Sequence, residues 1–118
     1  MRAAHQVVYE NGRWDGKTPA EWVPEVVDAI VRAFDPIEVV LFGSIARGDL
    51  TPRSDADLLV ILRAADDPPR HRVPRYLPAD SSVPLDVFPF TRAELDERVS
   101  EGNPFFVRAL REAVRIYP

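Results

Sequence analysis

The chain has 118 residues, of which 46% are hydrophobic and 29% are charged. This length fits one domain, and the composition is that of a globular protein with a packed core. A formal net charge of −4, from 15 basic and 19 acidic residues, argues against the broad basic face that binds long nucleic acid. The absence of cysteine excludes disulfides, thiolate metal sites and a cysteine nucleophile.

The apolar runs of the sequence are short. The longest, residues 39–42 and 58–62, have the length of strands and fall far below the roughly 20 residues of a membrane-spanning helix. The N-terminus lacks the apolar core of a signal peptide. We therefore expect a cytoplasmic protein with no membrane partner.

Residues 1–18 are expected to form an N-terminal extension built around a β-hairpin. Asn11 and Gly12 separate two short apolar-rich runs, residues 7–9 and 13–14. Asn-Gly is a strong hairpin signal because both central positions of a type I′ turn require a positive φ. Residues 19–118 are expected to form the main domain.

The first helix of that domain is predicted from its boundaries and its periodicity. Residues 18–21 (TPAE) have the spacing of a capping box, and apolar residues recur at helical spacing from Val23 to Phe34. The helix is expected to end near Phe34, because Asp35 precedes Pro36 and is pushed away from helical dihedrals.

The remaining elements follow from β-rich runs, capping patterns and prolines. Strands are predicted at residues 37–42, 57–62 and 83–88, with a short helix opening at Ser44 and helices at about 91–100 and 104–113. Pro84 indicates a strand start or an edge strand, and residues 114–117 predict a last short strand. Residues 63–82 are interrupted by prolines, so any helix there is short or broken. This order indicates an α+β (α/β-like) fold.

Gly43 and Ser44 lie where the first predicted strand ends and the short helix begins. Gly43 lets the backbone approach a ligand closely because it has no Cβ. Backbone amides at the helix start and the Ser44 hydroxyl are suited to bind a phosphate. Alone, the pair is more typical of an ordinary strand-to-helix turn.

Three aspartates strengthen the interpretation of a functional site. Asp55 and Asp57 are two residues apart at the entrance of a predicted strand, so their side chains share one face. Two adjacent carboxylates repel each other, and a divalent cation such as Mg²⁺ relieves that repulsion. Asp86 lies in the third strand among apolar neighbours, and it converges on the other two if the strands are adjacent. The alternatives are a solvated turn for the pair and a solvent-facing edge strand for Asp86.

Gly43-Ser44, ten intervening residues, Asp55-Ala56-Asp57 and a later strand carrying Asp86 resemble the nucleotidyltransferase superfamily of DNA polymerase beta. The short chain, with GSIARGD and SDADLLV, is most similar to the minimal nucleotidyltransferases. The resemblance implies a small mixed sheet flanked by helices, with ATP as substrate. It also implies that Asp55, Asp57 and Asp86 form the catalytic site and bind two Mg²⁺ ions, while Gly43 and Ser44 bind phosphates. Phosphoryl-type transfer needs charge neutralisation and in-line positioning, and Asp86 is the candidate for accepting the hydroxyl proton.

The other candidate residues are weaker. Arg47 matches an arginine of the family motif and is a candidate nucleotide ligand; the alternative is that it braces the turn by pairing with Asp49 or Asp55. Arg53, His5 and His71 are given no role. The large aromatic residues are expected to be core or interface residues, and some are expected to reach the surface: Trp14, Trp22, Phe105 and Phe106.

The resemblance also implies a partner, because minimal nucleotidyltransferases often accompany a helical HEPN-domain protein. On this basis we expect an antitoxin that transfers AMP from ATP to a hydroxyl, such as a tyrosine of a HEPN-type toxin. Two alternatives stay open: a non-catalytic antitoxin that neutralises its partner by binding, and a transferase for a small molecule such as an aminoglycoside. The three aspartates favour catalysis, because a pure binding module does not need them.

Overall fold

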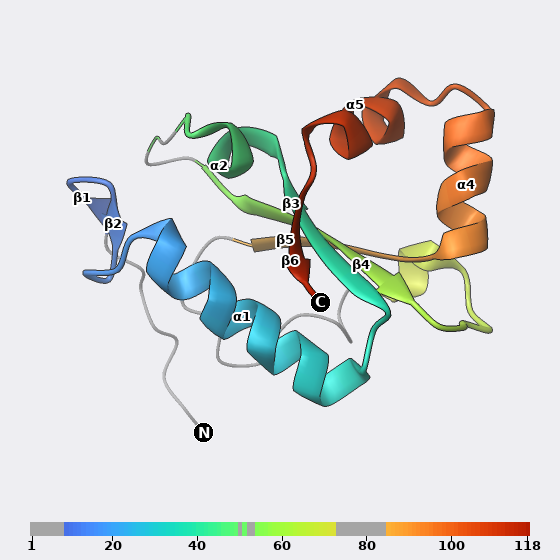
Figure 1. The fold of residues 1–118 in the computed structure, drawn as a ribbon, viewed down its shortest axis with the longest axis horizontal. Coiled ribbons are helices and arrows are strands. Elements are labelled where there is room, and N and C mark those ends of the chain that lie inside the picture. The colour runs from blue at the N-terminus through green and yellow to red at the C-terminus, as the bar shows by residue number, and fades with distance from the viewer. Residues whose placement is uncertain (1–8, 50, 52–53, 73–84) are drawn as a thin grey trace.

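The computed structural model describes residues 9–49, 51, 54–72 and 85–118. A small hairpin precedes a four-stranded sheet that has helices on both faces (Figure 1). The elements in chain order are β1 (Tyr9–Glu10), β2 (Arg13–Trp14), α1 (Pro19–Phe34), β3 (Glu38–Phe42), α2 (Gly43–Arg47), β4 (Ala56–Leu62), the 3₁₀ turn η1 (Pro69–His71), β5 (Leu85–Thr91), α4 (Arg92–Ser100), α5 (Pro104–Glu112) and β6 (Val114–Tyr117).

The main sheet has the strand order β5-β4-β3-β6. β4 and β5 are parallel, whereas β3 is antiparallel to both β4 and β6. The sheet is therefore mixed, and the predicted α+β fold is confirmed. β5 lies at the edge of the sheet, as Pro84 suggested, although Pro84 itself lies outside the described residues.

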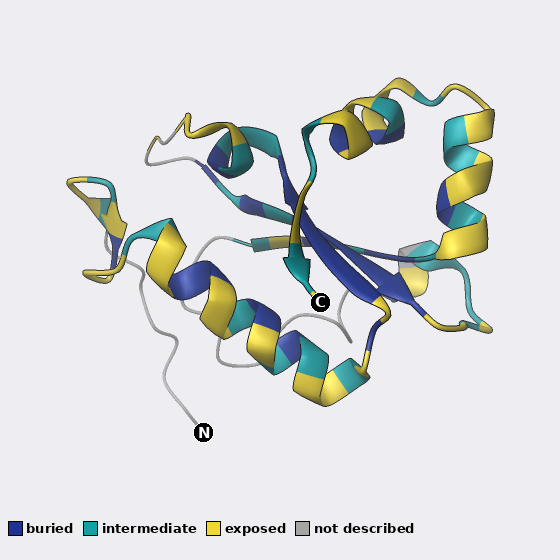
Figure 2. Cartoon of the chain, in the orientation of Figure 1, coloured by how far each residue is buried: buried dark blue, intermediate teal, exposed yellow. Residues whose placement is uncertain are grey.

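Both faces of the sheet are covered by helices. Side chains alternate between the faces along each strand: in β4, Leu58 and Val60 pack on the α1 side with Val27 and Ile30. On the other side, Leu59 and Ile61 pack with side chains of β5, α4 and α5, which are Phe90, Leu95, Phe106 and Ala109. The central strands are consequently buried along their length (Figure 2).

Local signals account for the element boundaries. Asn11 and Gly12 have φ values of 54° and 76°, as a type I′ hairpin turn requires. At α1 the Glu21 carboxylate accepts a hydrogen bond from the Thr18 backbone N–H at 3.3 Å, which confirms the predicted capping box. The helix ends at Phe34, and Asp35 adopts a left-handed conformation with φ 46°.

Some boundaries differ from those predicted. β5 continues to Thr91, three residues beyond the predicted end, and includes the buried Pro89. Proline is tolerated there because an edge strand does not need every N–H for pairing. α5 ends at Glu112, and Ala113 is already extended. Within residues 63–72 the structure has only a 3₁₀ turn, as the prolines predicted; residues 73–82 lie outside the described part.

The prediction that the large aromatic residues belong mainly to the core is confirmed for three of the four. Trp14 and Trp22 are 1% and 2% exposed and contact each other edge to face, with ring centroids 5.8 Å apart. Phe106 is also buried. Trp14 and Trp22 belong to the core on the α1 side of the sheet, and Phe106 belongs to the core on the α5 side. Phe105 alone of the four remains exposed, at 46%.

One buried arginine ties η1 to α4. Arg72 is 1% exposed and binds both oxygens of Glu94, at 2.6 and 2.9 Å. It also bonds to Asp67 and to the Pro89 carbonyl. Its charge is thus fully compensated, as a buried guanidinium requires.

In the described part of the chain, no helix combines the length and apolar character needed to cross a bilayer.

Candidate active site

The end of β3 brings Gly43 against Asp57. Phe42 is paired with Asp57 in the antiparallel β3–β4 register, and the chain turns at Gly43 with φ 79° into α2. A Cβ on Gly43 would lie 2.1 Å from Asp57 Oδ2. Glycine is therefore required at this position for two reasons: the backbone has a positive φ, and the Asp57 carboxylate occupies the space that a Cβ would need.

One part of the predicted convergence of Asp86 on Asp55 and Asp57 is present in the sheet register. Asp57 in β4 is the direct partner of Asp86 in the parallel strand β5. Side chains paired in register lie on the same face, here the face covered by α5. Asp86 is exposed because β5 is the edge strand. The two alternatives for Asp86 therefore hold together: it faces solvent and it adjoins Asp57.

Asp55 completes the group of acids. Burial raises the pKa of its carboxyl, and the charge of Asp86 and a hydrogen bond with Asp86 raise it further. The pKa of Asp57 is raised to about 6, first by burial, then by Asp86 and Asp55, against a smaller opposing effect of Arg47. Three mutually repelling carboxyl groups therefore share one end of the sheet.

Ser54 fixes the loop that precedes these acids. Its hydroxyl accepts a hydrogen bond from the Thr51 N–H at 3.0 Å and donates to the Asp49 carbonyl at 3.2 Å. Ser54 is only 5% exposed. Because Asp55 is the next residue, the buried serine sets the position from which the chain enters β4.

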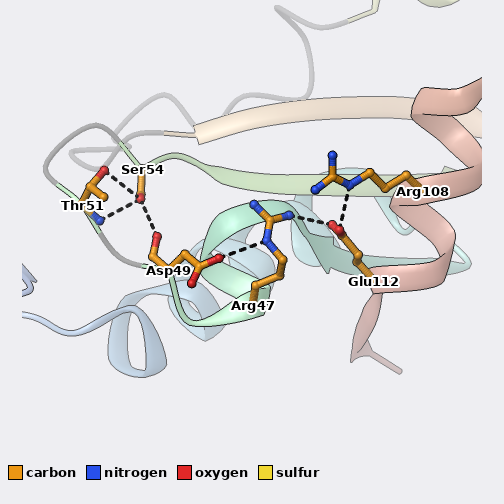
Figure 3. A network of polar contacts seen from close by, with 6 residues as sticks. All are labelled: Arg47, Asp49, Thr51, Ser54, Arg108 and Glu112. Carbon is orange, nitrogen blue, oxygen red and sulfur yellow. Dashed lines mark hydrogen bonds and ion pairs between the residues drawn. The ribbon is translucent and has the colours of Figure 1, made fainter.

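Arg47, at the end of α2, takes part in ion pairs. Its Nε lies 3.2 Å from Asp49 Oδ2, and its Nη1 lies 2.9 Å from Glu112 Oε2. Arg108 contacts the other oxygen of Glu112, with Nε and Oε1 2.9 Å apart (Figure 3). The pairing with Asp49 agrees with the bracing alternative, and the contact with α5 was not anticipated.

A cleft of about 360 Å³ opens between α2 and α5, beside the acids. Asp57 and Gly43 form one side of it, and α5 forms the other. The cleft combines both charge signs with an aromatic wall, which suits a ligand that is part anionic and part apolar. Its lining residues are Phe42, Gly43, Arg47, Asp57, Pro104, Phe105, Arg108, Ala109 and Glu112.

The sequence of residues 23–112 matches the nucleotidyltransferase domain family. The chain belongs to this family. The matched region runs from α1 through α5 and includes the Gly43 turn and the three acids. The general activity of the domain is therefore nucleotidyl transfer, and the enzyme is a transferase.

Other comparisons add little to the family assignment. A solved structure of a candidate nucleotidyltransferase from Sulfolobus solfataricus is similar, with 27% sequence identity and a TM-score of 0.48, over 65% of this chain and 70% of that one. No curated protein matches the sequence at a significant level.

The acids of this nucleotidyltransferase domain have the chemistry of a magnesium site. Carboxylate oxygens are the ligands that Mg²⁺ prefers, and the raised pKa of Asp57 marks a place where a cation would relieve repulsion. Among the residues described, however, no three His, Cys, Asp or Glu side chains are arranged as a ready metal-ligand group. The two-ion site implied by the resemblance therefore stays a prediction.

Several residues of the site were not identified from the sequence. Arg108, Glu112 and Phe105 line the cleft from α5, and their spacing of three and four residues places them on one helix face. The sequence showed that spacing, but it did not show which part of the fold this face of α5 packs against.

The other residues considered from the sequence lie as follows. Ser44 is half-buried in the first turn of α2. His71 lies in η1, and Arg53 and His5 lie outside the described residues.

Proposed function

We propose that this domain transfers AMP from ATP to a hydroxyl group in a magnesium-dependent reaction. The observation that carries the proposal is the register of Asp57 with Asp86, together with the position of Asp57 against Gly43 in the lining of the cleft. This arrangement gathers negative charge where phosphoryl transfer needs cations and a proton acceptor.

The proposed reaction is an in-line displacement at the α-phosphorus of ATP. The acceptor oxygen forms a bond to that phosphorus, the bond from the α-phosphorus to the bridging oxygen breaks, and pyrophosphate leaves with the bonding electrons. The hydroxyl proton passes to a carboxylate. Asp86 is suited to this step because it is exposed on the edge strand, where an acceptor can approach it.

Magnesium would be held by Asp57 and Asp55, with Asp86 completing the set. When bound, it neutralises the charge of the triphosphate and of the carboxylates. Gly43 leaves room for Asp57 close to the start of α2, and the backbone amides there with the Ser44 hydroxyl would bind phosphate oxygens. The acids thus act as cation ligands and the turn acts as the anion site.

For the acceptor, we propose a tyrosine hydroxyl on a HEPN-type partner protein, with this chain as the antitoxin. The proposal rests on the resemblance to minimal nucleotidyltransferases, and the exposure of Asp86 on the edge strand supports it. A protein-borne hydroxyl can reach an exposed acid at a sheet edge without a dedicated acceptor pocket.

Intact-mass spectrometry tests the proposal. The chain is incubated with ATP, Mg²⁺ and the product of an adjacent gene, and a mass increase of one or more AMP groups on that product is expected. The increase should be absent with Asp55→Asn/Asp57→Asn. A stable complex with no mass change would indicate a non-catalytic antitoxin instead, and transfer of AMP only to an aminoglycoside would indicate a small-molecule transferase.

A further inference from the structure

The side chains of Arg47, Glu112 and Arg108 form one network across the cleft (Figure 3). Arg47 belongs to α2, and the other two residues belong to α5. Arg47 and Glu112 are 65 residues apart in the sequence. Each arginine binds a different oxygen of the Glu112 carboxylate, at 2.9 Å in both cases. Two guanidinium groups therefore converge on two oxygens of one anion.

The location of Glu112 is unfavourable for the helix that carries it. Glu112 is the last residue of α5, where the negative end of the helix dipole disfavours an anion. The Arg108–Glu112 pair also has the basic residue on the N-terminal side, the weaker order for a pair spaced by four residues. Helix stability alone thus gives no reason for a glutamate at this position.

The arginines compensate for this disadvantage. The Glu112 side chain is 18% exposed, and its pKa is lowered by hydrogen bonds from Arg108 and then from Arg47. Arg108 is 70% exposed, so its guanidinium can change partners without breaking the core. The same cleft is lined by Asp57, and the charge of Arg47 acts on the Asp57 carboxyl.

We propose that Arg108 and Arg47 together bind phosphate oxygens of the nucleotide, and that Glu112 occupies their guanidinium groups until the nucleotide arrives. The inference rests on the proposed function, because it takes the cleft beside Asp57 as the nucleotide site. Arginine pairs bind phosphate and carboxylate oxygens with the same geometry. A polyphosphate carries more charge than one carboxylate and displaces it.

Substitutions of the two members of the α5 pair should have opposite effects on phosphate binding. Arg108→Ala removes a phosphate ligand and weakens binding. Glu112→Gln removes the competing anion and leaves both arginines in place, so binding becomes tighter. A network with a purely structural role would give no such opposition, since either change would only loosen the cleft.

Titration calorimetry with inorganic tripolyphosphate in metal-free buffer tests the arginine pair apart from the aspartates. We expect Arg108→Ala to weaken binding about tenfold, the scale of one charge-assisted contact. Glu112→Gln should tighten binding about two- to fivefold, the scale of partly exposed ion pairs, while lowering the melting temperature. Arg111→Ala and Glu97→Gln, which change exposed residues outside the cleft lining, should stay within about twofold of the wild type.

Weaker or unchanged binding by Glu112→Gln, or equal effects of Arg108→Ala and Arg111→Ala, would overturn the inference. A parallel titration with ATP and Mg²⁺ separates it from the proposed function. If Asp57→Asn abolishes the metal dependence but the α5 variants bind like the wild type, only the inference fails. If the α5 variants behave as expected and Asp57→Asn has no effect, only the proposed metal-dependent reaction fails. If the wild-type protein binds neither tripolyphosphate nor ATP with Mg²⁺, both the inference and the proposed function are rejected.

Discussion

The carboxylate of Asp57 occupies the space that a side chain on Gly43 would need, with Oδ2 2.1 Å from the position of the missing Cβ. This contact joins the end of β3 to the acid in β4 that adjoins Asp86. The glycine of the turn and the carboxylate of the strand are therefore one structural unit, and a change in either should alter the other.

Gly43→Ala should abolish most nucleotide binding. The new Cβ would displace the Asp57 carboxylate, and the φ of 79° adds a backbone strain of about 1–2 kcal/mol. We expect at least a tenfold loss of affinity for ATP with Mg²⁺, measured by calorimetry, together with a lower melting temperature.

Gly48→Ala is the matched control for that variant. Gly48 has nearly the same φ, 82°, but a Cβ there would have no neighbour within 4 Å. It should lose a comparable free energy of unfolding and keep its nucleotide affinity. If both alanine variants bind like the wild type, the contact with Asp57 does not control the site.

Asp57 should make the metal-free protein less stable as the pH rises. Its pKa is about 6 in the folded state and its ordinary value is 3.8. Between these values the folded protein holds more protons than the unfolded chain, so the free energy of unfolding falls with increasing pH. The loss should be on the order of 2 kcal/mol and complete above about pH 7.

Asp57→Asn should flatten this profile, because the amide does not titrate. Urea unfolding between pH 4 and 8 in metal-free buffer gives the comparison. The variant should be more stable than the wild type at neutral pH, and the two should approach each other near pH 4. Parallel profiles would show that burial and the neighbouring acids do not strain Asp57 as described.

Glu94 should have the opposite dependence. Hydrogen bonding to Arg72 lowers the pKa of Glu94 to about 2 from its ordinary 4.5. The pair therefore stabilises the fold above about pH 4.5, and the contribution is lost as the pH falls toward 2. Glu94→Gln keeps a residue that suits a capping box but removes the charge beside a buried guanidinium.

The expected decrease in the free energy of unfolding for Glu94→Gln at pH 7 is about 1–3 kcal/mol. Glu97→Gln, an exposed change on the same helix, should alter it by less than about 0.5 kcal/mol. Chemical denaturation at pH 7 and pH 3 measures both. An equal effect of the two variants at pH 7 would contradict the role given to Arg72 and Glu94.

Ser54→Ala should loosen the segment that carries Asp55. It removes the hydroxyl that joins Thr51 to Asp49, so the free energy of unfolding should fall by about 1 kcal/mol. Affinity for ATP with Mg²⁺ should fall as well, because Asp55 follows directly. Ser100→Ala, at an exposed position, is the control; wild-type affinity in Ser54→Ala would mean that the loop does not position the acid.

The sequence predicted most of the fold because its signals are local. The Asn11-Gly12 turn, the capping boxes at Thr18 and Thr91 and the break at Pro36 each act within a few residues. The approach of Asp86 to Asp57 was expected if their two strands were adjacent, whereas the register that pairs them directly was not predicted.

The far wall of the cleft was not predictable in the same way. Arg108 and Glu112 take their role from the placement of α5 over the end of the sheet, which no short-range pattern specifies. The burial of Trp14 and Trp22 likewise depends on how the hairpin packs on α1. The predicted strand ended at Phe88, one residue before Pro89, whereas β5 continues through Pro89 to Thr91 because an edge strand tolerates proline.

Calorimetric titration of ATP, with and without Mg²⁺, into the wild-type protein and Asp57→Asn tests the central claim most directly. The wild type should bind ATP with an affinity that rises with Mg²⁺, and Asp57→Asn should lose most of that rise, at least about tenfold or 1.4 kcal/mol. Equal and metal-independent affinities in the two proteins would contradict the assignment of Asp57 and its neighbouring acids to a metal–nucleotide site.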